Sequence, residues 1–265
     1  MLRLFAFIIT TLAAATSFCG DDTSWKTVFS EEFEGTALNM SRWTVRDASQ
    51  ENDSSCREAR CMAANVAVSG SALHLTARKE VSSWANITTG AIESRDKAFW
   101  EATGSGAFRV CVSGSLPGAD GTGAGYWPAF WMMPNDASCW PDHGELDIME
   151  QINGDPRVYA TYHTSPAGAA CKGVDDSEGG SLSVPGFNSF NEYAVEVRGD
   201  GSFSFVYNGA VVHAYNSTRA LPKHVVPWYL ILNFAVGGPW PKPPNAATIF
   251  PAVVSVDYVR VAVKA

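Results

Sequence analysis

The stretch "EYAVEVRGDGSFSFVYNGAVVHAY", residues 192–215, carries the clearest local signal for the fold. Apolar residues recur at every second position before Asp200-Gly201, and Phe203, Phe205 and Tyr207 repeat that pattern before Asn208-Gly209. A period of two is that of a β-strand, and Asp-Gly and Asn-Gly pairs favour tight hairpin turns. The stretch therefore predicts a meander of three antiparallel strands.

The remainder of the chain extends this β pattern. Residues 65–79 read as two short strands around Ser69-Gly70-Ser71, and residues 247–263 end the chain with another alternating run. No segment has a sustained helical period, repeat or linker. Many short strands favour an all-β, two-sheet antiparallel sandwich, and we predict one such domain over residues 20–265.

The first residues resemble a targeting signal. "MLRLFAFIITTLAAATSF" has Arg3, an apolar run over residues 4–12 and small residues over 13–17. This is the plan of a secretory signal peptide, and the run is too short to span a bilayer. We predict that residues 1–19 are removed and that the product is secreted. The alternative is a buried N-terminal strand or helix.

Sequons and cysteines agree with secretion. We predict N-glycosylation at the asparagines of the four Asn-x-Ser/Thr triplets, Asn39, Asn52, Asn86 and Asn216. Cleavage after Cys19 leaves five cysteines, an odd number. We expect the near neighbours Cys56 and Cys61 to pair, and Cys139 to pair with Cys171, which leaves Cys111 free. No Cys/His spacing resembles a zinc site.

Charge excludes some partners. The net charge of −8 offers no basic stripe for nucleic acid or for an anionic membrane. Only 17% of the residues are charged, while there are nine tryptophans. This composition fits a binder of neutral ligands, although core packing accounts for most of the tryptophans. We expect a monomer.

The stretch "DHGELDIMEQING", residues 142–154, carries three acids. Glu145 and Asp147 share one face of a strand, but strict alternation would bury Glu150 in the core. A lone buried carboxylate is costly. We therefore predict a β-bulge at Ile148-Met149, which turns both residues inward and returns Glu150 to the acidic face.

Crowded carboxylates favour catalysis. Their repulsion raises some of their pKa values, and glycoside hydrolysis uses one carboxylate as nucleophile and another as acid and base. An ionised Glu145 would help Glu150 to stay protonated, and the acids would titrate as a coupled set. A solvated acidic strand and a calcium cage are the alternatives.

The segment "GELDIMEQ" resembles the E-x-D-x-x-E motif of glycoside hydrolase family 16, and its extra residue is similar to the laminarinase-type branch. "GYWPAFWMMP" (125–134) and "WYLILNFAVGGPWP" (228–241) resemble the family's upstream and downstream segments. "VFSEEFEGTALNMSRW" (28–43) and "VDYVRV" (256–261) resemble its first and last strands. The resemblance thus spans nearly all of residues 20–265.

The resemblance implies a concanavalin-like β-jelly roll with a concave glycan cleft and retaining hydrolysis. It assigns Glu145 as nucleophile, Glu150 as acid/base and Asp147 as helper. The residues that match positions contacting sugar in relatives are Trp127, Trp131, Trp140, Trp240, Asn65, Arg95, His163 and Asn233. His163 can face the cleft or the outside, and core packing is an even alternative for Trp131.

The resemblance also implies a structural calcium ion, held by Asp257 with the Glu32 and Gly70 carbonyls, and no catalytic cofactor. The implied activity is endo-hydrolysis of β-1,3-glucan (laminarin) or mixed β-1,3/1,4-glucan. A glycan-binding lectin, a transglycosylase and a galactan-type hydrolase are the alternatives. The stretch "SGAFRVCV" (105–112) departs from the family pattern, which bears on the substrate more than on the mechanism.

Overall fold

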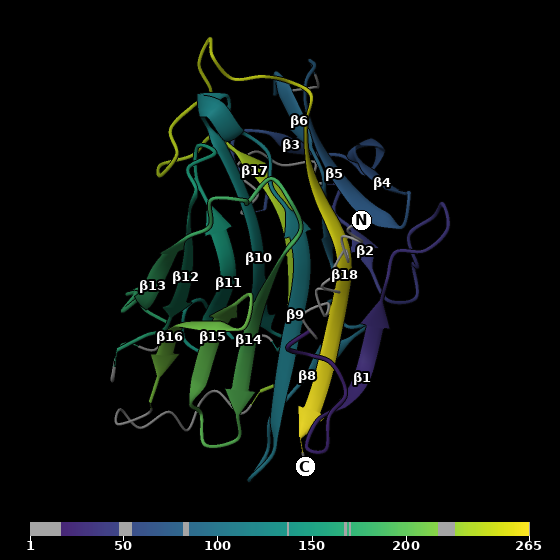
Figure 1. Ribbon diagram of the computed structural model, residues 1–265. Coiled ribbons are helices and arrows are strands. Elements are labelled where there is room, and N and C mark those ends of the chain that lie inside the picture. Colours follow the sequence, from purple (N-terminus) through teal and green to yellow (C-terminus); the bar gives the residue numbers. More distant parts are fainter. Residues whose placement is uncertain are drawn as a thin grey trace, which may run out of the picture.

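The computed structural model describes residues 17–47, 55–81, 85–136, 138–166, 169, 171–216 and 226–264. Within these ranges the chain forms eighteen strands and two short 3₁₀ helices, η1 (Ala63–Asn65) and η2 (Ala119–Gly121). The strands build two sheets that lie against each other (Figure 1). The predicted all-β sandwich is confirmed. No helix in the described part of the chain is long and apolar enough to cross a membrane.

The first sheet has ten strands, in the order β16-β15-β14-β9-β18-β5-β6-β3, with β1 paired to β18 and β4 to β5. It contains the predicted meander and the two predicted strands around Gly70. Its strands are β1 (Lys26–Glu31), β3 (Arg60–Cys61), β4 (Val66–Ser69), β5 (Ala72–Lys79), β6 (Ile87–Thr89), β9 (Ala107–Ser115), β14 (Asn191–Arg198), β15 (Phe203–Tyr207), β16 (Ala210–Tyr215) and β18 (Ala252–Lys264).

The second sheet has eight strands, in the order β13-β12-β11-β10-β17-β7-β2, with β8 paired to β17. It carries the acidic ladder on β11. Its strands are β2 (Thr44–Val45), β7 (Ala91–Glu93), β8 (Phe99–Trp100), β10 (Tyr126–Pro134), β11 (Glu145–Gln151), β12 (Arg157–His163), β13 (Glu178–Ser183) and β17 (Trp228–Val236). Among the strand pairs that the described residues form in both sheets, only that of β3 with β6 is parallel.

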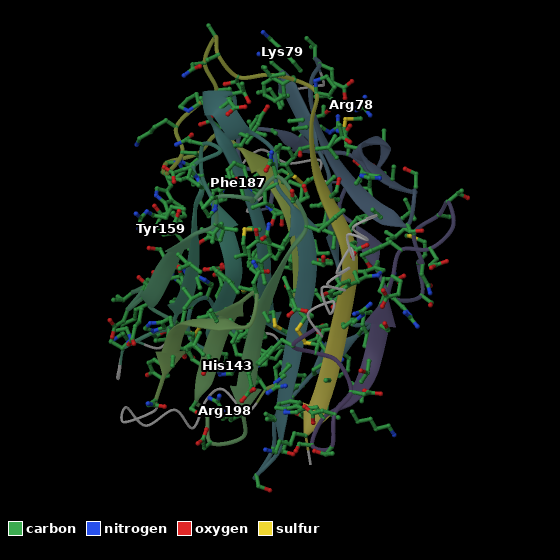
Figure 2. The ribbon with its side chains drawn as sticks, viewed as in Figure 1. Arg78, Lys79, His143, Tyr159, Phe187 and Arg198 are labelled. Carbon is green, nitrogen blue, oxygen red and sulfur yellow. A yellow bond between two sulfur atoms is a disulfide. The ribbon has the colours of Figure 1, made fainter. Side chains whose placement is uncertain are left out.

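The core lies between the sheets, where inward side chains of both layers meet (Figure 2). On β10 and β17 the inward positions are large and apolar, as with Phe130 and Leu232, and both are fully buried. The alternate positions of these strands point to the opposite face of the second sheet. Polar side chains at these alternate positions therefore lie on the outer face of the second sheet, away from the core.

Three disulfides link the described residues, and two of them are the predicted pairs, Cys56–Cys61 and Cys139–Cys171. The prediction that Cys111 is free is wrong, because Cys111 pairs with Cys19. The sequence separation is 92 residues, so no local pattern links the two cysteines. Three disulfides are typical of an oxidising compartment outside the cytosol.

Candidate active site

The outer face of the second sheet lines a cavity of about 700 Å³. Strands β10, β11, β12 and β17 supply its floor through the positions that alternate with the core. Nine of the eleven residues predicted for catalysis or sugar binding line it, and Asn65 and Arg95 do not. His163 faces the cavity together with Thr161, which decides the orientation that the sequence left open.

The bulge in β11 is confirmed. Asp147 pairs with Thr161 of β12, and Glu150 pairs with Tyr159, so β11 has one more residue between these pairs than β12. Ile148 and Met149 are both fully buried in the core, as predicted. The extra residue resets the strand period, and Glu150 shares the cavity face with the other two acids.

Each acid has a specific hydrogen-bond partner in the cavity. The Trp140 indole N–H donates to Glu145, and the Trp127 indole N–H donates to Glu150 over 2.8 Å. Asp147 is 3% exposed, and its carboxylate lies 3.0 Å from Nε2 of His163. These donors stabilise carboxylates that burial would otherwise disfavour.

Burial is the largest cause that raises the pKa of all three acids. It raises the pKa of Glu145 to about 8, with a further contribution from the Asp147 charge. It raises the pKa of Asp147 to about 7, aided by the Glu150 charge, and that of Glu150 to about 7, aided by the Glu145 charge. The cluster therefore holds protons near neutral pH, where one acid can donate while another attacks.

His163 is a cation that faces this cluster. Burial alone would lower its pKa, but the hydrogen bond and charge of Asp147, the Glu145 charge and Asp175 raise it to about 10. Nδ1 of His163 lies 2.8 Å from a carboxylate oxygen of Asp175, so the ring bridges two carboxylates. Asp175 lies between β12 and β13, and the sequence did not reveal its role because no local motif marks this contact.

The four predicted tryptophans divide into two pairs. Trp140 and Trp240 are 45% and 37% exposed, so their rings are accessible for sugar stacking. Trp127 and Trp131 are only 9% and 8% exposed. The Trp131 indole N–H donates to the Asn233 side-chain oxygen over 2.6 Å, and the Asn233 amide donates to the Ser55 carbonyl. The second pair therefore forms the floor of the cavity and fixes its polar groups.

Asn65 and Arg95 lie elsewhere. Asn65 is buried. Its side-chain amide donates to Thr88 and accepts from Arg78, so both ends of the amide that was predicted to meet sugar already have partners. Arg95 is exposed, and its guanidinium lies 5.7 Å from the centre of the Tyr229 ring. Neither residue lines the cavity in the described structure, and their contact with sugar stays a prediction.

Arg57 is a cavity residue that the sequence did not reveal. The Cys56–Cys61 disulfide closes its loop, and a positive φ of 59° turns the residue toward the cavity. Its guanidinium lies 4.6 Å from the centre of the Trp127 ring, and its charge opposes the rise in the pKa of Glu150. The closely spaced cysteines gave the loop but not the direction of this side chain.

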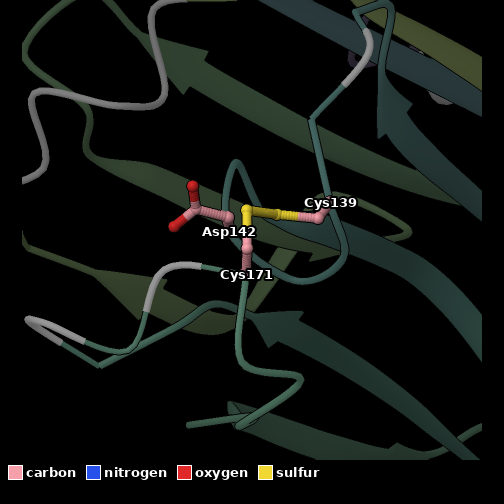
Figure 3. Close-up of side chains that lie close together, drawn as sticks. All are labelled: Cys139, Asp142 and Cys171. Atoms are coloured by element: carbon pink, nitrogen blue, oxygen red, sulfur yellow. A yellow bond between two sulfur atoms is a disulfide. The ribbon is translucent and has the colours of Figure 1, made fainter.

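Two loops beside the cavity are tied together. Cys139 lies next to Trp140, and Cys171 lies in the loop that carries Asp175, so their disulfide joins the supports of two acids (Figure 3). Asp142 lies near these sulfur atoms, which makes a cluster of possible metal donors. The sulfurs are bonded to each other and are not thiolates, so the cluster does not fit a metal ion.

The predicted calcium residues come from three separate segments. Asp257 lies on β18 between Val256, which pairs with Leu73, and Val259, which pairs with Glu31. The register of β18 with β9 shifts at this point, between Val256 and Tyr258. The Glu32 carboxylate accepts two hydrogen bonds from Arg260, both 2.8 Å. One carboxylate and two carbonyls suit calcium in kind, but they supply fewer than the six oxygens it needs. The remaining ligands would have to be other carbonyls or water.

Three predicted glycosylation sites, Asn39, Asn86 and Asn216, are exposed. Asn52 lies outside the described residues, as do residues 1–16 of the predicted signal. The Asn39 side-chain oxygen accepts from the Ser41 hydroxyl over 2.7 Å. Exposure is necessary for modification, and glycosylation stays a prediction.

A β-sandwich with a carboxyl cluster on one open sheet face, and with accessible indoles on both sides of it, has the architecture of a glycan-cleaving enzyme. Glu145 and Glu150 sit at opposite ends of the cluster. Trp140 lies beside the first, while Trp240 lies 5.5 Å, centre to centre, from Trp127 beside the second. A sugar chain crossing the cavity would meet an indole on each side of the acids.

Comparisons with known proteins narrow this class. Residues 119–198 match the model of the XgeA-like catalytic GH16 domain. The chain is 31% identical over 283 residues to a β-glucanase of Rhodothermus marinus, and the alignment covers 98% of this chain and 94% of that protein. It is 29% identical to glucan endo-1,3-β-glucosidase A1 of Niallia circulans, of which it spans 37%.

Solved structures agree. The endo-β-1,3-glucanase of Pyrococcus furiosus superposes with a TM-score of 0.76 and 27% identity, covering 91% of this chain and 95% of that one. The endo-1,3-β-glucanase of Streptomyces sioyaensis gives a TM-score of 0.80 and 25% identity, covering 94% and 100%. The chain belongs to glycoside hydrolase family 16. It is a glycoside hydrolase of the endo-β-1,3(4)-glucanase type.

Proposed function

We propose that this protein is a secreted endo-hydrolase that cuts internal bonds of β-1,3-glucan, or of mixed β-1,3/1,4-glucan, with retention of configuration. The observation that carries the proposal is the bulged acid cluster, with both glutamates on the cavity face. The presence of both glutamates argues against a lectin that has lost catalysis. The names of the Rhodothermus and Niallia relatives support a β-glucan substrate.

In the first step, a Glu145 oxygen attacks the anomeric carbon as the bond to the leaving sugar oxygen breaks. Glu150 gives its proton to that oxygen, and a glycosyl ester on Glu145 remains. In the second step, Glu150 takes a proton from water as the water attacks the same carbon and releases Glu145. Asp147, hydrogen-bonded to both Glu145 and His163, holds the nucleophile in place.

The mechanism requires Glu145 to ionise while Glu150 keeps its proton. In the free cavity, burial raises the pKa of Glu145 to about 8 and that of Glu150 to about 7, so the cluster holds protons near neutral pH. In the transition state, positive charge develops at the carbon beside Glu145 and favours the ionised form of this nucleophile. The sugar also removes water from Glu150 and favours its neutral form.

The sharpest test compares Glu145→Gln and Glu150→Gln with the unaltered protein. Each variant is expected to lose turnover of laminarin while still binding it, because the amide keeps the shape but neither attacks nor donates a proton. Proton NMR of fresh hydrolysate is expected to show the β-anomer first. Turnover by Glu145→Gln at the unaltered rate, or an initial α-anomer, would contradict the mechanism.

A galactan-type activity is the second candidate. A keratan-sulfate endo-1,4-β-galactosidase of Sphingobacterium multivorum is 33% identical over 147 residues, although the chain spans only 33% of that protein. A screen against laminarin, mixed-linkage glucan, galactan and agarose, with the products sized, separates the two. Longer oligosaccharides formed at high laminarin concentration would instead indicate transglycosylation.

We also propose a structural calcium ion at Asp257, with the Glu32 and Gly70 carbonyls, a monomeric state and glycosylation at the exposed sequons. Binding to the folded state alone raises stability by mass action. Calcium is therefore expected to raise the Tm relative to a chelator, and Asp257→Asn is expected to abolish the difference while leaving turnover intact. An equal calcium effect in both proteins would exclude this site.

A further inference from the structure

The bulge in β11 interrupts the pairing of this strand on both sides. Ile148 has no register partner in either β10 or β12. A bulged residue loses its place in the ladder, and an unpaired carbonyl in a dry core is costly. The Ile148 carbonyl accepts a hydrogen bond from outside its own sheet.

Tyr207 of β15, in the opposite sheet, supplies that donor. Its hydroxyl lies 2.8 Å from the Ile148 carbonyl oxygen and 2.9 Å from the Tyr159 carbonyl oxygen. The side chain is 1% exposed. The hydroxyl has a single proton, which the two carbonyls share, and it thus bridges β11 and β12 beside the bulge.

The bridged carbonyls flank the acid/base. Ile148 precedes Glu150 by two residues, and Tyr159 is the register partner of Glu150. The Tyr159 ring lies 4.9 Å, centre to centre, from Trp240 at the same end of the cavity. The Tyr207 hydroxyl therefore holds the backbone two residues before Glu150 and the backbone of its register partner on β12.

We propose that Tyr207 is a positioning residue for Glu150, acting through the bulge without touching substrate. The inference rests on the proposed role of Glu150 as acid/base. Burial raises the pKa of Tyr207 well above its usual value, so the hydroxyl keeps its proton for the carbonyls. We expect loss of the hydroxyl to leave these buried carbonyls without this donor, and Glu150 to shift relative to the leaving oxygen.

Tyr207→Phe tests the proposal, because it keeps the ring and removes only the hydroxyl. We expect kcat on laminarin to fall about tenfold or more with KM within about twofold, since misplacement costs the transition state rather than binding. On a dinitrophenyl β-glucan oligosaccharide, whose leaving group needs no proton, kcat/KM is expected to stay within about twofold.

Tyr193→Phe is the matched control. Tyr193 is fully buried, its ring centre lies 5.2 Å from that of Tyr207, and its hydroxyl has no hydrogen-bond partner in the described structure. This variant is expected to match the unaltered protein on both substrates. Near-UV circular dichroism at the assay temperature verifies that both variants are folded.

Three outcomes would overturn the proposal: unaltered laminarin turnover by Tyr207→Phe, an equal loss on both substrates, or the same loss in Tyr193→Phe. Glu150→Ala tests the proposed function separately. It is expected to lose laminarin hydrolysis but to keep the first-turnover burst of dinitrophenolate, because forming the ester on Glu145 needs no acid for this leaving group. Steady-state release then slows, since Glu150 is also the base that frees the ester. Loss of the burst together with laminarin hydrolysis would overturn the acid role of Glu150, whatever Tyr207→Phe does.

Discussion

At the residue scale, the site is organised by one imidazolium among several carboxylates. His163 faces Asp147 and Glu145 from one side and Asp175 from the other, and its charge also acts on Glu150. Because its pKa is raised to about 10, the ring is charged over the range in which the acids titrate. It is the main positive charge that keeps the pKa values of the buried acids from rising further.

His163→Gln is therefore expected to move the pH profile of kcat/KM to higher pH. Loss of the positive charge raises the pKa of both the nucleophile and the acid, so ionisation of Glu145 and deprotonation of Glu150 both occur later as pH rises. Initial rates on laminarin across about pH 4 to 10 measure this. The control is His143→Gln, which removes a histidine paired with Asp136. An unmoved profile in His163→Gln would contradict the assignment.

At the element scale, strands set the floor of the cavity and loops set one of its walls. Strand pairing fixes the face of the sheet on which each acid lies, whereas Trp140 and Asp175 come from loops with little pairing of their own. The Cys139–Cys171 disulfide joins those two loops. Loop position at this end of the cavity therefore depends on a covalent link rather than on a ladder of hydrogen bonds.

Replacing both Cys139 and Cys171 with serine is expected to raise KM several-fold and to lower kcat, because the Trp140 and Asp175 supports loosen. The Tm is also expected to fall, because removing a disulfide typically lowers the free energy of unfolding by about 2–4 kcal/mol. Kinetics on laminarin and thermal unfolding measure both effects. The matched control is the double serine variant of Cys19 and Cys111, which is expected to lower the Tm without changing KM. Equal KM changes in the two variants would mean a general loss of packing.

At the scale of the whole molecule, the start of the described chain is fastened to the outer face of the ten-stranded sheet. The guanidinium of Arg109 lies 3.9 Å and 3.7 Å from the ring centres of Phe18 and Trp25. Glu192 accepts hydrogen bonds from the Ser17 hydroxyl and the Phe18 amide. Together with the Cys19–Cys111 disulfide, these contacts make residues 17–19 part of the folded domain.

We therefore propose that a signal peptide is cut before Ser17 rather than after Cys19. N-terminal sequencing of the secreted protein is expected to find a start at or before Ser17. A non-reducing peptide map is expected to contain a Cys19–Cys111 peptide. A mature chain that begins at Gly20, with a free thiol at Cys111, would contradict both this proposal and the observed disulfide.

The sequence by itself determined the sandwich, the meander of β14 to β16 and the bulge, because each depends on local rules. Strand alternation and turn type depend on neighbours along the chain. The cost of burying Glu150 left only one arrangement of β11, in which all three acids face the same side of the sheet. The acid cluster follows from that arrangement alone.

Only the tertiary structure decided which partners meet these elements. Cys19 with Cys111, Asp175 with His163 and Tyr207 with Ile148 are contacts between segments that no shared pattern links. It also divided the tryptophans into exposed and enclosed pairs and turned Asn65 away from the cavity. The physical reason is that the exposure and the hydrogen bonds of a side chain depend on the residues that the fold packs against it. The spacing of residues along the chain does not determine those neighbours.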